Sequence, residues 1–109
     1  MMKILFLLLL FLPMLTIAQE SVVVRGMVKD VNSQESIGNV KITYFNSNNH
    51  VKNTITTDEN GIFELSLHAK VGEKFYFIAE KEGYSSHKMV KRIKNVNQLI
   101  VLNFYIGSD

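Results

Sequence analysis

The chain has 109 residues, with 12 lysines and arginines against 10 acidic residues and no cysteine. This length accommodates one domain. The near balance of charge argues against nucleic acid as a main partner, because phosphate binding needs a concentrated basic face. The absence of cysteine excludes a disulfide framework and a lipid-modified cysteine, so stability must come from the apolar core.

The N-terminal segment has the layout of a secretory signal peptide. Lys3 supplies a positive charge, Ile4–Ile17 is a mainly apolar run of 14 residues, and Ala18 offers a small residue for cleavage. A membrane-spanning helix needs roughly 17–25 residues, so a retained anchor is the weaker alternative. We therefore predict a signal peptide over residues 1–18 and an exported domain over residues 19–109, located in the periplasm, in the cell envelope or outside the cell.

Alternating apolar and polar residues predict seven short strands in the exported domain. The predicted strands are Ser21–Asp30, Asn39–Phe45, Val51–Thr57, Ile62–Leu67, Lys74–Glu80, Tyr84–Ile93 and Gln98–Ile106. No segment after the leader shows a sustained helical period, and turn residues separate the strands. This pattern predicts an all-β protein, a seven-stranded antiparallel Greek-key sandwich.

The stretch Thr54–Leu67 is predicted to form a β-hairpin around a turn at Asp58–Gly61. Asp58 can accept hydrogen bonds from backbone N–H groups ahead of it, and Asn60 or Gly61 can adopt a positive φ. A four-residue loop built on a type I turn is a common hairpin connection. The strand after the turn should bury its alternate apolar residues, Phe63, Leu65 and Leu67. We expect this turn to have a structural role.

Spaced motifs run along most of the exported domain. They are Val24-x-Gly26-x-Val28-x-Asp30, Ile37-Gly-x-Val40-x-Ile42, Thr57-Asp58-x-x-Gly61-x-Phe63-x-Leu65 and Gly83-Tyr84. Together they resemble the carboxypeptidase regulatory-like domain family, whose fold is a transthyretin-like (prealbumin-like) seven-stranded sandwich. The resemblance covers about Ser21 to Ile106, although the loop before Ile37 lacks a proline often found there. It implies a stand-alone exported bacterial module without catalytic activity, for which carbohydrate binding and structural support are the usual suggestions.

The sequence contains no constellation typical of a metal or catalytic site. The turn at Asp58–Gly61 lacks the alternating acidic ligands that calcium needs. The histidines at positions 50, 68 and 87 are too widely spaced for a metal clamp. Ser85-Ser86-His87 lacks the glycines of a nucleophile elbow. We therefore expect no catalytic residues, no metal and no cofactor.

One enzyme family of this fold provides a remote alternative. The transthyretin-related hydroxyisourate hydrolases end in Tyr-Arg-Gly-Ser, which corresponds to Tyr105-Ile106-Gly107-Ser108 here. Ile106 replaces their arginine, and Met27 replaces the histidine of their early motif. Neither replacement can activate water or hold an anionic purine derivative.

Strand parity places six apolar side chains on outer faces, which in a sandwich are mostly polar. They are Phe45, Tyr76, Ile78, Leu99, Val101 and Tyr105, and they make up the candidate binding surface. Exposed apolar surface indicates an envelope protein partner or self-association. The rings of Phe45 and Tyr76 also permit stacking on a glycan. We predict docking or structural support at the bacterial cell envelope, with carbohydrate binding as the alternative and the membrane contacted through a transient signal peptide.

The sixth predicted strand is basic, with Lys88, Lys91, Arg92 and Lys94. Lysine on an edge strand protects a sheet from pairing with other chains. The same charge could contact acidic glycans or lipid headgroups. The edge-strand interpretation is preferred, because Glu80 and Glu82 lie nearby in sequence.

Overall fold

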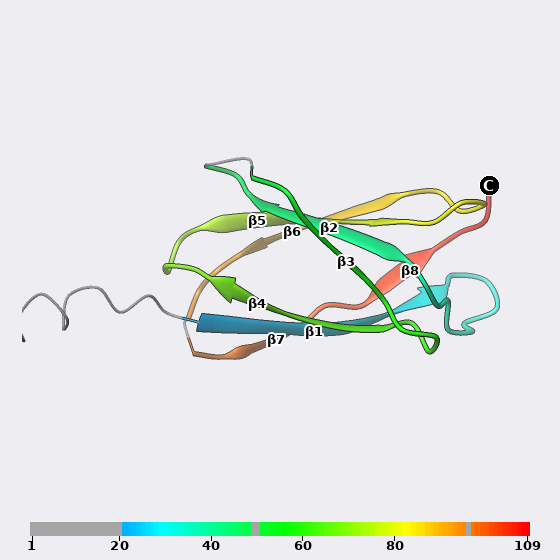
Figure 1. Ribbon diagram of the computed structural model, residues 1–109, viewed down its shortest axis with the longest axis horizontal. Helices are drawn as coiled ribbons and strands as arrows, with labels where there is room; N and C mark the ends of the chain where they lie inside the picture. Colours follow the sequence, from blue (N-terminus) through cyan, green and yellow to red (C-terminus); the bar gives the residue numbers. More distant parts are fainter. Residues whose placement is uncertain (1–20, 49–50, 96) are drawn as a thin grey trace, which may run out of the picture.

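A computed structural model describes residues 21–48, 51–95 and 97–109, which form a two-layered β-sandwich (Figure 1). Its strands are β1 (Ser21–Asp30), β2 (Lys41–Asn46), β3 (Asn53–Thr56), β4 (Ile62–His68), β5 (Lys74–Glu80), β6 (His87–Arg92), β7 (Leu99–Val101) and β8 (Phe104–Ile106). The first sheet has the order β4-β1-β7, with β8 also paired to β1, and the second has the order β3-β2-β5-β6. The predicted all-β sandwich is confirmed, and the predicted signal peptide lies outside the described residues.

The core forms between the two sheets from one parity of each long strand. In β4 the predicted residues Phe63, Leu65 and Leu67 are buried, and their neighbours in the strand are exposed. The same alternation buries valines of β1 and the apolar residues Phe75 and Phe77 of β5. Each large apolar side chain removed from water stabilises the fold by roughly 1.5–3 kcal/mol. These burials are the main force that holds the two sheets together.

The chain has eight strands, because the single strand predicted over Gln98–Ile106 is interrupted. Its two halves, β7 and β8, both pair with β1, and both pairings are parallel. The prediction of a purely antiparallel, seven-stranded sandwich is therefore wrong at this edge. β7 follows a crossover from the second sheet, which can deliver a strand in either direction, whereas a tight hairpin cannot. β8 continues in the same direction and register.

The interruption lies at Leu102, which passes close above Gly26 of β1. A Cβ atom built on Gly26 would lie 1.7 Å from the Leu102 carbonyl oxygen. The backbone N–H of Leu102 donates to the Arg25 oxygen at 2.9 Å, and Asn103 Oδ1 accepts from the Met27 N–H at 3.2 Å. A residue without a side chain is needed at position 26 because another backbone occupies that space.

The predicted hairpin between β3 and β4 is also wrong. β3 pairs with β2 in the second sheet, and β4 pairs with β1 in the first. The turn at Asp58–Gly61 therefore carries the chain from one sheet to the other (Figure 1). The turn residues and the strand alternation are the same for a hairpin and for such a corner, so local signals did not distinguish them.

The chemistry predicted for this corner is confirmed. Asp58 Oδ1 accepts hydrogen bonds from the N–H groups of Asn60 at 2.8 Å and Ile62 at 2.9 Å. Gly61 has a φ of 76°, a conformation that glycine adopts without steric cost. The Gly61 carbonyl accepts from the Val28 N–H at 2.9 Å, which fastens the corner to β1.

Thr57, which directly follows β3, makes two hydrogen bonds with the backbone of Val40. Its Oγ1 accepts from the Val40 N–H at 2.9 Å, and its own N–H donates to the Val40 carbonyl at 2.9 Å. The threonine is only 2% exposed. Its hydroxyl therefore satisfies a backbone donor that has no access to water.

Replacing Gly61 with valine should destabilise the fold strongly. Its Cβ would lie 2.7 Å from the Val28 oxygen and 2.8 Å from the Ile37 oxygen. Gly72→Val is a matched control, since Gly72 also has a positive φ of 97° but no atom lies within 4 Å of its Cβ position. Backbone strain should cost each variant about 1–3 kcal/mol, and overpacking should cost Gly61→Val about 1–3 kcal/mol more. Thermal unfolding measures the difference; equal melting of the two variants would contradict the close packing of the corner.

Thr57→Val should cost about 1–3 kcal/mol of unfolding free energy, because it leaves the buried Val40 N–H without an acceptor. Thr54→Val is the control, since Thr54 is exposed on β3 and substitutions at exposed sites usually change stability by about 0.5 kcal/mol or less. Urea unfolding of both variants tests this. Similar midpoints for the two would show that the Thr57 hydroxyl contributes nothing.

Candidate binding surfaces

The structure divides the six predicted surface residues between opposite sides of the sandwich. Leu99 and Val101 of β7 and Tyr105 of β8 lie on the outer face of the first sheet. Phe45 of β2 and Tyr76 and Ile78 of β5 lie on the outer face of the second sheet. The six residues therefore do not form one continuous surface.

The outer face of the first sheet carries an apolar face, which we define as Val23, Met27, Ile62, Leu99, Val101 and Tyr105. The pairings of β1 bring these residues together: Val23 is opposite Leu99, and Met27 is opposite Ile62. Ile62, Leu99, Val101 and Tyr105 are 43%, 50%, 62% and 48% exposed. The sequence analysis missed Ile62, although it shares the parity of the water-facing residues Glu64 and Ser66.

One ion pair crosses the middle of the apolar face. Arg25 Nη2 lies 2.9 Å from Glu64 Oε2, and Arg25 Nε donates to the same oxygen at 3.0 Å. Both side chains are about half exposed. An exposed pair contributes little stability, roughly 0–1 kcal/mol. The two contacts nevertheless fix the positions of one pair of opposite charges within the otherwise apolar face.

The outer face of the second sheet carries an aromatic ridge, made of Phe45 and Tyr76. Their rings are stacked with centroids 5.1 Å apart, as expected for residues directly opposite on β2 and β5. Lys52 Nζ lies 5.7 Å from the Phe45 centroid, and Lys88 Nζ lies 4.5 Å from the Tyr76 centroid. The strand order puts the two lysines on the outer sides of the pair. Each ring thus has a ring over one face and an ammonium group over the other.

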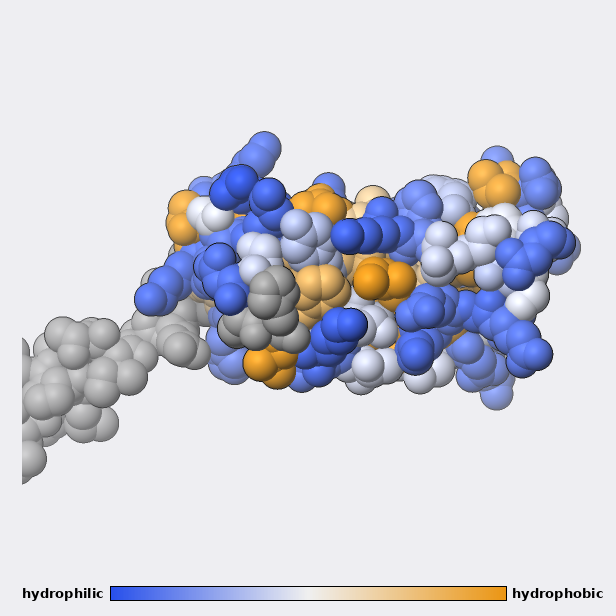
Figure 2. Space-filling model, turned by 90° about the horizontal axis from the view of Figure 1, so that it is seen from above, coloured by the Kyte–Doolittle hydropathy of each residue, from blue (hydrophilic) through white to orange (hydrophobic). Residues whose placement is uncertain are grey.

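Seen from above, the molecule shows small hydrophobic areas separated by hydrophilic side chains (Figure 2). The basic strand β6 is an edge of the second sheet, as the sheet order shows. Its lysines therefore occupy the position at which charge protects a sheet edge from pairing.

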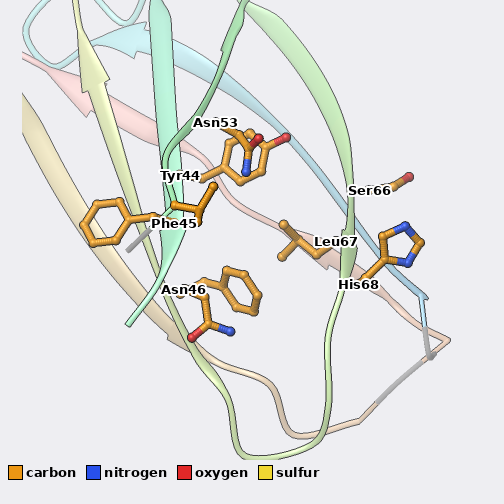
Figure 3. A pocket seen from close by; sticks show the side chains of 9 residues that line it. Tyr44, Phe45, Asn46, Asn53, Ser66, Leu67 and His68 are labelled. Atoms are coloured by element: carbon orange, nitrogen blue, oxygen red, sulfur yellow. The ribbon is translucent and has the colours of Figure 1, made fainter. Parts of the chain in front are cut away.

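A groove of about 380 Å³ opens between the two sheets where β2 and β3 diverge from β4 (Figure 3). Tyr44 and Leu67 are directed toward each other across it, whereas Ser66 and His68 are directed away from it. Tyr44 is held by its ring contact with Phe77, at a centroid distance of 6.3 Å. The sequence analysis did not detect this groove, because its two walls belong to different sheets.

The polar side chains of the groove differ in whether they already hydrogen-bond to other parts of the protein. The Asn46 amide donates to Glu73 Oε2, and its Oδ1 accepts from the Asn48 N–H at 2.8 Å. Asn46 is therefore committed to holding the loop between β2 and β3. The Tyr44 hydroxyl and the exposed Asn53 side chain are the groups at the groove's mouth that can contact a ligand.

Titratable side chains do not converge on a site within the described ranges. No group of three or more histidine, aspartate and glutamate side chains there is placed to hold a metal ion. The His87 ring meets the Phe104 ring edge-on at a centroid distance of 6.1 Å, and His68 is exposed on β4. Ser85 Oγ donates to Asp109 Oδ1 at 3.0 Å. His50 lies outside the described residues.

The residues aligned with the hydroxyisourate hydrolase motifs do not come together. Ile106, at the arginine position, is buried in the core with 2% exposure. Met27, at the histidine position, has the opposite parity and lies on the outer face of the first sheet. These two positions therefore cannot contribute to one pocket.

Several solved structures share this fold. The 3-chlorocatechol 1,2-dioxygenase of Rhodococcus opacus 1CP has a TM-score of 0.67 at 16% identity over 84% of this chain and 62% of its own. The chlorocatechol 1,2-dioxygenase of Pseudomonas putida has a TM-score of 0.70 at 12% identity over 84% and 62%. The pilus 2b backbone protein of group B streptococcus has a TM-score of 0.50 at 16% identity over 85% and 42%.

These similarities establish the fold, a prealbumin-like β-sandwich, and no more, because the identities are low. The chain spans less than two thirds of the length of each of these structures. No family model matches the sequence. No curated protein matches it either. Membership of the carboxypeptidase regulatory-like domain family therefore remains a prediction.

Proposed function

We propose that the chain is a non-catalytic exported module that binds another protein of the bacterial cell envelope through its apolar face. The observation that carries this proposal is the exposure of Ile62, Leu99, Val101 and Tyr105 on one sheet face, each at 43% or more. Removing apolar surface from water contributes roughly 25 cal/mol per Å². A partner that covers this face would gain that free energy, and a second copy of the chain is the alternative occupant.

The position of the apolar face within the sheet supports docking. It extends to the edge formed by β7, which has three residues and ends the strand order of its sheet. A partner can therefore contact both the apolar side chains and the strand edge. The Arg25–Glu64 ion pair would fix the orientation of the partner, because charged pairs contribute specificity more than affinity.

The non-catalytic part of the proposal rests on the family resemblance and on the dispersed titratable side chains of the described ranges. The dioxygenases that share the fold are enzymes, and the pilus backbone protein is named for an assembly role. Fold alone does not choose between these roles. The apolar face favours the second kind, since it is mostly hydrocarbon area for contact, and its titratable groups, Tyr105 and the ion-paired Glu64, do not form a cluster with other such groups.

A photo-crosslinking amino acid at Val101 should give one discrete adduct with an envelope protein in cells. The same residue at Thr54, exposed on the second sheet, serves as control and should give little adduct. Mass spectrometry of the adduct identifies the partner, and a mass of twice the chain indicates self-association. Equal adduct patterns from positions 101 and 54 would contradict the docking proposal.

A second candidate function is carbohydrate binding, which the groove between the sheets favours over the aromatic ridge. The ring faces of the ridge are covered, so a sugar could not stack on them without displacing a lysine. The groove has a volume within the roughly 300–1,000 Å³ typical of small-ligand sites. It combines the apolar Leu67 with the Tyr44 hydroxyl and the Asn53 amide, groups that can hydrogen-bond sugar hydroxyls.

If a glycan binds in this groove, Tyr44→Phe and Asn53→Ala should each weaken binding by about tenfold, equivalent to the loss of one hydrogen bond of about 1.4 kcal/mol. Tyr76→Ala is the control, since Tyr76 lies on the outer face of the second sheet. A glycan array followed by calorimetry provides the measurement. An array without hits excludes carbohydrate binding as a function. A loss of glycan binding limited to Tyr76→Ala would instead place the glycan site on the aromatic ridge.

A further inference from the structure

The described chain separates its charges along the long axis of the sandwich. The described parts of three connections lie at the end where β1 begins: residues 46–48 and 51–53, residues 68–74, and residues 92–95 and 97–99 (Figure 1). Hydrogen bonds join them, from the Ser47 N–H to the Lys74 carbonyl at 2.9 Å and from the Gly72 N–H to the Ile93 carbonyl at 2.7 Å. Their cations are Lys52, Lys70, Lys74, Arg92 and Lys94. We call these five residues the basic end.

Six of the nine acidic side chains in the described ranges lie at the opposite end, around the corner and the chain terminus. Those residues are Asp30, Glu35, Asp58, Glu59, Glu82 and Asp109. Backbone hydrogen bonds place them there, such as Asn39 N–H to the Asp58 carbonyl at 3.2 Å and Asp109 N–H to the Gly83 carbonyl at 3.0 Å. Lys29, Lys41 and Lys81 also lie in this half and partly offset its negative charge. The near-zero net charge of the chain therefore combines a positive end with a negative one.

The carboxylate within the three connections, Glu73, is engaged in holding the loops. Its Oε1 accepts from the Lys70 backbone N–H at 2.6 Å, and its Oε2 accepts from the Asn46 amide. The ion pairs found among the described residues, Arg25–Glu64 and Lys41–Glu80, lie elsewhere. Arg92 Nη1 donates to the Gly72 carbonyl at 2.8 Å, and Lys52 Nζ lies over the Phe45 ring. Neither contact neutralises a charge, and none of the five cations forms an ion pair among the described residues.

Apolar loop residues accompany these cations. Val51 and Val71 are each 62% exposed, which places them among the most exposed large apolar side chains described. Val51 adjoins Lys52, and Val71 adjoins Lys70 at the turn between β4 and β5. Exposed apolar side chains flanked by lysines are typical of surfaces that lie in the headgroup region of a bilayer.

The first strand of the sandwich begins at this end. Ser21, the first residue of β1, is bonded to this end, since its carbonyl accepts from the Asn97 N–H at 2.9 Å. The apolar run Ile4–Ile17 precedes Ser21 by three residues in the sequence. During export, while the predicted signal peptide is attached and still in the bilayer, the basic end would be the part of the domain nearest to the headgroups. Within the described ranges, no helix is long and apolar enough to cross a membrane.

We propose that the basic end docks on anionic phospholipid bilayers, with its five cations at the headgroups and Val51 and Val71 in the interfacial region. Juxtamembrane cations gain about 1 kcal/mol each from an anionic surface, or roughly fivefold in affinity, and the effect disappears beyond a Debye length of about 10 Å at 0.1 M salt. This orientation leaves the apolar face free at the side of the sandwich. The inference is therefore independent of the proposed docking partner.

The test uses the exported protein, purified from cells that express the full chain, in co-sedimentation with vesicles. Vesicles containing phosphatidylglycerol should bind it at least about tenfold more tightly than pure phosphatidylcholine, in a salt-sensitive manner. The difference between the two vesicle types isolates the headgroup contribution, because an apolar leader, if retained, would bind both. An N-terminal mass measurement shows which form is present.

A matched pair of double variants locates the contact. Lys70→Gln with Lys94→Gln should weaken binding to phosphatidylglycerol vesicles by about 25-fold, two cations at roughly fivefold each. Lys29→Gln with Lys41→Gln removes the same charge at the acidic half and should change binding by about twofold or less. Melting curves check that both variants are folded. Equal losses in the two variants, equal binding to both vesicle types, or tight binding to a soluble polyuronate without vesicle binding would each overturn the proposal.

Discussion

The corner at Asp58–Gly61 is the constraint on which the rest of the sandwich depends. It carries the chain from the second sheet to the first, so β3 and β4 can each find a partner strand in a different layer. Asp58 closes the turn with its carboxylate, and Gly61 lies so close to Val28 and Ile37 that no side chain fits there. The chain also passes between the sheets after β1, β4 and β6, but at this corner the crossing is fixed by close backbone packing that allows no side chain at Gly61.

β1 organises the first sheet in a similar way. It pairs with β4 on one side and with β7 and β8 on the other. The backbone of Leu102 passes over Gly26, which interrupts the C-terminal segment, and β8 then resumes the same parallel register on β1 that β7 has. The apolar face exists because β7 and β8 add Leu99, Val101 and Tyr105 beside the outward residues of β1.

The described surface offers three distinct contact chemistries. The apolar face presents hydrophobic area, the aromatic ridge is covered by its own lysines, and the basic end concentrates positive charge next to exposed valines. The apolar face and the aromatic ridge lie on opposite faces of the sandwich, and the ridge shares Lys52 with the basic end. A protein partner at the apolar face and a lipid surface at the basic end could therefore be engaged together, as a module at an envelope surface would require.

The sequence by itself determined the fold class, the buried parity of Phe63, Leu65 and Leu67, the edge role of the basic strand and the chemistry of the turn at Asp58–Gly61. These features depend on local alternation and turn geometry, which neighbouring residues specify. The tertiary structure decided which strands pair, so it replaced the hairpin with a corner and divided the candidate residues between two faces. It also gathered the basic end from three loops. Strand pairing and charge clustering are long-range outcomes, because several partners suit the same alternating strand and only the packing of the whole chain selects one.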